Sequence, residues 1–139
     1  MGRSAASWYF LSALAAALAA CSSTPEKDPA TDPNIVPANY KQEILLTLTR
    51  TLEDPTNLRD TYISEPALTG TGANKHYTAC IRFNARDARR SYTGSQDRIA
   101  YFYGGHLNQL VAATKEQCGN AAYKPFPELE KLCQANKCA

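Results

Sequence analysis

The strongest constraint on the fold is a strict alternation of apolar and polar side chains over residues 76–86. The apolar or small set is Tyr77, Ala79, Ile81, Phe83 and Ala85. The set between them is His76, Thr78, Cys80, Arg82, Asn84 and Arg86. Because successive side chains of a β-strand point to opposite faces, this period of two predicts a strand with one face on a hydrophobic core and one polar face.

Three other segments have the composition of strands, and they are Leu58 to Glu65, Arg98 to Tyr103 and His106 to Val111. Gly104-Gly105 separates the last two segments and suits a tight hairpin turn, because glycine tolerates a positive φ at both central positions. Asp87 to Gln96 is predicted to be a basic connection. Since consecutive strands with short links favour antiparallel pairing, we predict a three- to four-stranded antiparallel meander.

One amphipathic helix precedes these strands and is predicted over Asn39 to Leu52. Its apolar stripe consists of Tyr40, Ile44, Leu45, Leu48 and Leu52. This spacing follows the helical period and gives the helix a core-facing side. Asn39 and Gln42 have the spacing of a capping box. Asp54-Pro55 ends the helix by Glu53, because a residue before proline avoids the helical conformation.

Two short helical segments, Ala112 to Cys118 and Glu128 to Gln134, are predicted after the last strand. The chain is therefore assigned to the α+β class, with one N-terminal helix packed on the antiparallel meander and short helical segments at the C-terminus. The remaining length is enough for one domain only, and we place it at residues 38–134. Residues 135–139 are a polar tail.

The start of the chain is a leader with one charge, an apolar run and a cysteine. Arg3 supplies the positive charge, and residues 8–20 carry no charge. The run is too short for a membrane span of ~20 residues but has the length of the apolar part of a secretory signal peptide. Its end, Leu18-Ala19-Ala20-Cys21, places small residues directly before the cysteine. This motif resembles the lipobox of bacterial lipoproteins.

The resemblance covers only this leader, and residues 22–139 resemble no named family. It implies that residues 1–20 are a signal peptide, that Cys21 carries the lipid, and that two or three acyl chains hold the protein on a membrane. It also implies that Ser22, in place of an aspartate, directs the protein to the outer membrane. We place the domain on the periplasmic side, and exposure at the cell surface is the alternative. Two alternatives are ordinary secretion after cleavage at Ala17-Leu18-Ala19 and an uncleaved helix.

Residues 21–37 are predicted to be a lipid anchor and a proline-rich tether. Prolines recur at every fourth position, at Pro25, Pro29, Pro33 and Pro37. Such a segment stays extended and builds no core; the alternative is a proline-rich ligand. Arg3 is one of 15 basic residues, so 14 basic and 13 acidic residues follow the leader, a net charge of +1. This balance gives no indication of nucleic-acid binding.

Five cysteines occur in the chain, and four remain for disulfides if Cys21 is lipidated. They are Cys80, Cys118, Cys133 and Cys138. Disulfides persist in the compartment outside the cytoplasm that a signal peptide implies. Three connectivities are open. Short spacing favours Cys133 with Cys138, which leaves Cys80 for Cys118. A zinc site is the alternative, but it lacks a Cys-x-x-Cys pair, so we predict neither a metal site nor a cofactor.

Five arginines fall within 17 residues of one another and are the candidate binding residues. They are Arg82, Arg86, Arg89, Arg90 and Arg98. The planar guanidinium suits phosphate and carboxylate groups, which lipid A, anionic headgroups and the peptide stems of peptidoglycan all carry. The alternative is an ordinary solvated sheet face, with Asp87 and Asp97 as ion-pair partners. The predicted function is a non-enzymatic binding or assembly accessory that contacts an anionic envelope component or a protein.

Catalytic signals are weak in this chain. It contains no Gly-x-Ser-x-Gly, His-Glu-x-x-His or Walker-type motif, and it has only two histidines. We therefore predict no catalytic residue. The alternative function is a small periplasmic enzyme or enzyme inhibitor that acts through the loops Gly70 to His76 and Gly104 to His106.

Overall fold

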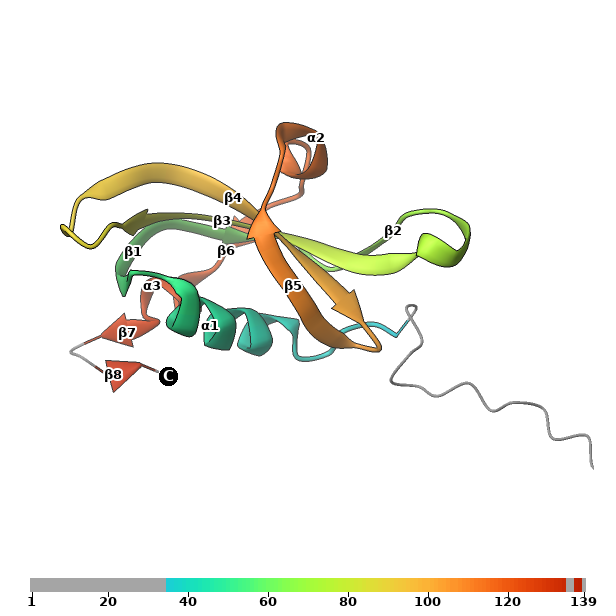
Figure 1. Cartoon of the computed structure of the whole chain (residues 1–139), viewed down its shortest axis with the longest axis horizontal. Coiled ribbons are helices and arrows are strands. Elements are labelled where there is room, and N and C mark those ends of the chain that lie inside the picture. Colours follow the sequence, from blue (N-terminus) through green and yellow to red (C-terminus); the bar gives the residue numbers. More distant parts are fainter. Residues whose placement is uncertain (1–34, 135–136, 139) are drawn as a thin grey trace, which may run out of the picture.

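The computed structural model describes residues 35–134 and 137–138. The predicted signal peptide, Cys21 and nearly all of the tether lie outside these residues. The described residues form a mostly antiparallel β-sheet accompanied by a few helices, as Figure 1 shows, and the assignment to the α+β class is confirmed.

The main sheet has six strands, two more than the longest meander that the sequence predicts. They are β1 (Asp54–Ile63), β2 (Ala67–Thr69), β3 (His76–Arg86), β4 (Tyr92–Tyr103), β5 (His106–Ala112) and β6 (Lys124–Pro125). The order is β5-β4-β3-β1-β6, and β2 also pairs with β3. The sequence misses β2 and β6 because segments of two or three residues are too short to show a period of two.

The helices are short except for the first. They are α1 (Tyr40–Thr51), α2 (Lys115–Cys118) and α3 (Pro127–Glu130), with a 3-10 turn at Gly72–Asn74. The predicted helix over residues 128–134 thus ends early, since β7 (Cys133–Gln134) pairs there with β8 (Lys137–Cys138). The Asn39 side chain makes no cap hydrogen bond. A capping box forms instead at α2, between Thr114 and Gln117.

Strand β3 has the predicted bounds, whereas β1 and β4 begin earlier than the sequence indicates. β1 begins at Asp54, because Asn57 and Asp60 adopt a positive φ of 53° each and let the strand pass through two register shifts. β4 begins at Tyr92, inside the predicted connection, and its register shifts near Gly94, which has a φ of 98°. Such bulges place an extra residue in a strand and thereby hide its alternation.

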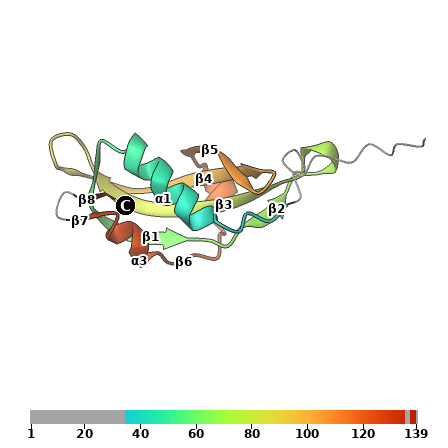
Figure 2. The ribbon, with the colours of Figure 1, turned by 90° about the horizontal axis from the view of Figure 1, so that it is seen from below.

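One face of the sheet carries the main hydrophobic core. Ile81 and Phe83 of β3 and Phe102 of β4 are at most 1% exposed, and Ile44 and Leu48 of α1 belong to the same cluster. In Figure 1, α1 and α3 lie below the sheet and α2 lies above it. Figure 2, which views the molecule from below, shows α1 running along the sheet. We call the face with Phe83 the inner face.

The opposite, outer face is more covered than the sequence predicts. Cys80 is only 6% exposed and packs with Ile99 and Cys118 in a second, smaller hydrophobic cluster. The disulfide Cys80–Cys118, with its Cα atoms 5.7 Å apart, fastens α2 to this face. Cys133 and Cys138 form the second disulfide. Both disulfides therefore have the pairing that the spacing favours.

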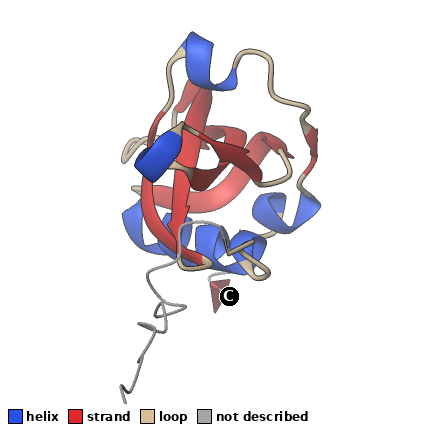
Figure 3. Ribbon diagram, turned by 90° about the vertical axis from the view of Figure 1, so that its right-hand side faces the viewer, coloured by secondary structure: helices blue, strands red, loops and turns tan. Residues whose placement is uncertain are grey.

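The β4–β5 hairpin is the predicted glycine turn, and it lies beside the start of the described chain. Gly104 and Gly105 have φ values of 57° and 81°. A side chain at Gly105 would place its Cβ 2.8 Å from the Ile35 Cγ2 atom, so glycine is required there by both conformation and space. Figure 3, seen from this end, shows the strands between the helices.

Candidate functional site

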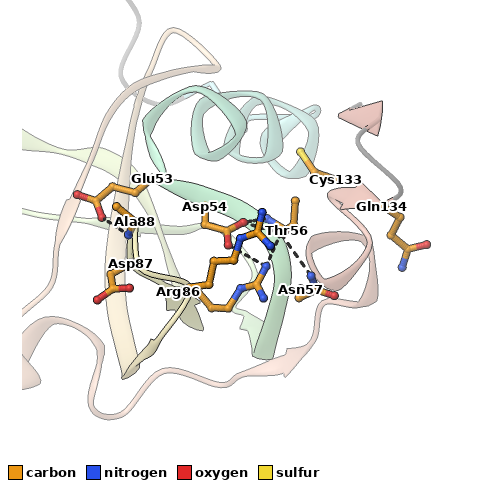
Figure 4. A pocket seen from close by; sticks show the side chains of 10 residues that line it. Glu53, Asp54, Thr56, Asn57, Arg86, Asp87, Ala88, Cys133 and Gln134 are labelled. Atoms are coloured by element: carbon orange, nitrogen blue, oxygen red, sulfur yellow. Dashed lines mark hydrogen bonds and ion pairs between the residues drawn. The ribbon is translucent and has the colours of Figure 1, made fainter.

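A polar cleft of about 610 Å³ opens at the end of the sheet where β1 begins and β3 ends. Its charged and polar side chains belong to Glu53, Asp54, Thr56, Asn57, Arg86, Asp87, Arg90 and Gln134. Cys133 also lines it, so the C-terminal disulfide borders the cleft. Figure 4 shows Arg86 between the side chains of β1 and the turn that follows β3. We call this the Arg86 cleft.

Arg86 is held in place by two neighbours on β1. Its Nη2 atom forms an ion pair with Asp54 Oδ2 at 2.8 Å and donates a hydrogen bond to Thr56 Oγ1 at 2.7 Å. The side chains of Arg86 and Asp54 are 18% and 14% exposed. The hydrogen bond from the Thr56 hydroxyl, assisted by the Arg86 guanidinium, keeps the pKa of the Asp54 carboxyl below its ordinary value. The Nε atom of Arg86 is buried and has no hydrogen-bond partner among the described residues.

The turn between β3 and β4 presents two further arginines. The Asp87 carboxylate accepts hydrogen bonds from the Arg89 and Ser91 backbone N–H groups at 2.9 and 3.0 Å, and it thereby fixes the turn. Arg90 has a φ of 63°, lines the cleft and is exposed, as is Arg89. Glu53 Oε2 accepts from the Ala88 N–H at 3.0 Å and ties the turn to the end of α1. Arg86, Arg89 and Arg90 therefore lie at one end of the sheet.

Arg82 is on the outer face but is already paired. Its guanidinium donates two hydrogen bonds to the Asp97 carboxylate, at 2.7 and 2.8 Å, and its Cζ atom lies 4.5 Å from the centroid of the Tyr123 ring. The hydrogen bond from Arg82 lowers the pKa of the Asp97 carboxyl. Burial, together with the Asp97 charge, raises the pKa of Tyr123 to about 12. Arg82 is thus part of a structural ion pair.

Arg98 lies on the other face from Arg82. Its partner across the β3–β4 ladder is Ile81, a core residue of the inner face, whereas the partner of Arg82 is Asp97. Directly opposed residues of an antiparallel pair share a face. The structure consequently brings together three of the five predicted arginines and separates Arg82 and Arg98 from them.

Both histidines lie at the opposite end of the sheet from Arg86. His106 follows the glycine turn, is exposed, and pairs through Nδ1 with Glu43 Oε1 at 3.1 Å. The His76 ring lies 5.5 Å from the Tyr103 ring and 5.3 Å from the Tyr101 ring. No group of three or more histidines, cysteines or carboxylates suited to a metal ion occurs within residues 35–134 and 137–138.

Several residues of the Arg86 cleft have no signal in the sequence analysis. The sequence predicts only that Asp54-Pro55 ends a helix. Arg59 lies 4.2 Å from the centroid of the Tyr92 ring, whose hydroxyl donates to the Asn57 carbonyl at 2.8 Å. The sequence feature that could have indicated these residues is the mostly polar segment from Asp54 to Asn57, since Asp and Thr side chains often bind nearby backbone N–H groups.

Comparisons of the chain with protein-family models, with curated proteins and with solved structures found no match. In the part of the chain that the structure describes, no helix is both long enough and apolar enough to cross a membrane.

Proposed function

We propose that the protein is a lipid-anchored, non-enzymatic binding protein of the bacterial cell envelope, with its anchor in the outer membrane and its domain in the periplasm. In this proposal, Cys21 carries the lipid, and the Arg86 cleft binds a carboxylate or phosphate group of an envelope component or protein. The observation that carries the proposal is the position of Arg86 and Arg90 in the wall of one polar cleft, with Arg89 exposed on the same turn.

The three carboxylates that line the cleft are already engaged, Asp54 by Arg86, Asp87 by two backbone N–H groups and Glu53 by the Ala88 N–H. Arg86 is neutralised by Asp54 and fixed by Thr56, so its role is to shape the cleft. Arg89 and Arg90 are exposed, and neither side chain makes an ion pair within the described residues; a bound anion would supply one. Arginine favours this role because its fork binds both oxygens of a carboxylate or phosphate group.

The position of helix α1 on the sheet is also part of this proposal. We take α1 to be the N-terminal helix that backs the sheet, an interpretation supported by the burial of Ile44 and Leu48. Glu53, just after α1, holds the arginine turn through the Ala88 N–H. The helix thus contributes to the position of Arg89 and Arg90.

The experiment measures retention of the full-length protein, purified in detergent, on two supports. One is insoluble peptidoglycan, whose peptide stems carry carboxylates, and the other is vesicles that contain lipid A, which carries phosphates. We expect one support to retain the protein at low salt. The Arg89→Glu/Arg90→Glu variant should lose at least about tenfold in affinity, and retention should fall with salt because exposed charges are screened.

Lys75→Glu is the control, since Lys75 is an exposed cationic residue directly before β3, at the end of the sheet opposite Arg86. It should retain the wild-type affinity. Retention of the Arg89→Glu/Arg90→Glu variant at the wild-type level, or an equal loss for both variants, contradicts the proposal. Mass spectrometry of the N-terminal peptide tests the anchor separately, because an unmodified Cys21 would exclude it.

A further inference from the structure

A second cleft, of about 580 Å³, lies on the outer face of the sheet at the end opposite Arg86. Its volume is within the ~300–1,000 Å³ range of small-molecule sites. It lies between β2, the start of β3 and the segment from α2 to β6, and Thr69, Thr78 and Gln117 are among its polar residues. We call it the Gln117 cleft.

Aromatic rings lie on the same face of the sheet as the Gln117 cleft, next to two of its lining residues, Thr78 and Gln117. Gln117 Nε2 donates to the Tyr101 hydroxyl at 3.0 Å, and Tyr101 is opposite Thr78 in the β3–β4 ladder. The His76 ring lies beside Tyr101, stacks on Tyr103 with an interplanar angle of 22°, and is fixed by a 2.7 Å hydrogen bond between its Nδ1 atom and the Asn74 carbonyl. Tyr103 is 46% exposed, so part of its ring is free to contact a ligand.

The charges in the Gln117 cleft argue against an anionic ligand. Lys124 is its only cationic residue among the described lining residues, and its Nζ atom is paired with Glu65 Oε1 at 3.1 Å. Glu116 adds a second carboxylate. The cleft therefore lacks the free guanidinium or ammonium group that binding of a phosphate or carboxylate requires.

The uncharged groups in the cleft have the complementary chemistry for a sugar. The Thr69 and Thr78 hydroxyls, whose oxygens are 3.4 Å apart, can each both donate and accept hydrogen bonds, as sugar hydroxyls can. The Gln117 amide accepts from the Thr114 N–H and donates to Tyr101, and it has a second amide hydrogen to donate. Ala121 and Ala122 supply small apolar surface next to these groups. Exposed, rigid aromatic rings offer the flat apolar contact that the C–H face of a pyranose ring needs.

We propose that the Gln117 cleft binds an oligosaccharide with N-acetylated hexosamine units. One sugar ring lies against Tyr103, the polar groups of Thr69 and Gln117 bind hydroxyl and amide groups, and the alanines contact the acetamido methyl. This site is separate from the Arg86 cleft, and the two can be tested independently.

The test is calorimetric titration of the full-length protein in a detergent without a sugar headgroup. The probe is the β-1,4-linked tetramer of N-acetylglucosamine, and the comparison ligand is cellotetraose, which lacks the acetamido groups. We expect saturable binding of the probe, weaker by about tenfold or more for cellotetraose, because the comparison ligand leaves polar groups of the site unpaired. Tyr103→Ala should weaken binding of the probe by about tenfold or more, and Tyr103→Phe should preserve it.

Two controls make the result specific. Tyr62→Ala removes another exposed strand tyrosine, 39% exposed, at a different place on the sheet and should leave binding unchanged. Arg89→Glu/Arg90→Glu should also bind the probe normally. Absence of saturable binding, equal losses in the Tyr62 and Tyr103 variants, or loss only in the Arg89/Arg90 variant overturns the proposal. Circular dichroism of each variant establishes that it is folded.

Discussion

The two disulfides should contribute unequally to stability, because they close loops of different length. Cys80 and Cys118 are 38 residues apart, and Cys133 and Cys138 are 5 apart. In the chain-entropy account, closing these loops in the unfolded state stabilises the native state by about 4 and about 2 kcal/mol, respectively. The double variant Cys80→Ala/Cys118→Ala should therefore lose about 2 kcal/mol more than Cys133→Ala/Cys138→Ala.

Urea unfolding of the full-length protein in detergent measures both losses as changes in the free energy of unfolding. The denaturant slope m provides a second readout. Removal of the long cross-link lets the unfolded chain expose more surface, so m should rise in Cys80→Ala/Cys118→Ala. Loss of packing alone, around the fully buried Cys118, would leave m unchanged. The loop-length argument would be refuted if Cys80→Ala/Cys118→Ala lost no more free energy of unfolding than Cys133→Ala/Cys138→Ala and its m were unchanged.

Two further predictions concern an ion pair and the core. The lowered pKa of the Asp97 carboxyl, caused chiefly by its hydrogen bond to Arg82, contributes stability that is complete above the ordinary aspartate pKa of 3.8 and is lost as the pH falls below it. Urea unfolding at pH 7 and pH 3 should accordingly show a smaller drop in stability for Asp97→Asn than for the wild type; an equal drop would contradict this. Ile44→Ala, at a fully buried position, should cost about 2–5 kcal/mol, whereas Leu46→Ala, at a position 44% exposed, should change the melting temperature little.

The parts of the fold that the sequence predicts are those with a regular local pattern. The bounds of β3 follow from its alternation, and the hairpin follows from Gly104-Gly105, whose positive φ values only glycine adopts readily. The start of β1 could not be predicted, since Asn57 and Asp60 shift its register and both residue types usually mark turns. Coverage of the outer face depends on the contact of Cys80 with Cys118, which is distant in sequence.

The candidate arginine surface was only partly predictable for a related reason. Arg82 of β3 is directly opposite Asp97 of β4, and Arg98 is opposite Ile81. Since neighbouring residues of a strand point to opposite faces, this register places Arg82 and Arg98 on different faces. The register of a hairpin is set by its turn and bulges, and a slip of one residue moves every side chain to the other face. The spacing of residues in the sequence does not determine how β3 and β4 are aligned, so the face of Arg98 could not be assigned.

The positions of the two clefts relative to the start of the domain favour different ligands. Ile35 contacts the β4–β5 hairpin, at the end of the sheet that carries the Gln117 cleft. The 11 residues of β3 span about 33 Å at ~3.3 Å per residue, so Arg86 lies far from this entry point. If Cys21 is the anchor, the 14 residues from there to Ile35 reach at most about 50 Å. The tether then enters the domain beside the Gln117 cleft, and the Arg86 cleft is the one farther from the anchored end. We therefore expect peptidoglycan, and not lipid A of the anchoring membrane, to be the ligand of the Arg86 cleft.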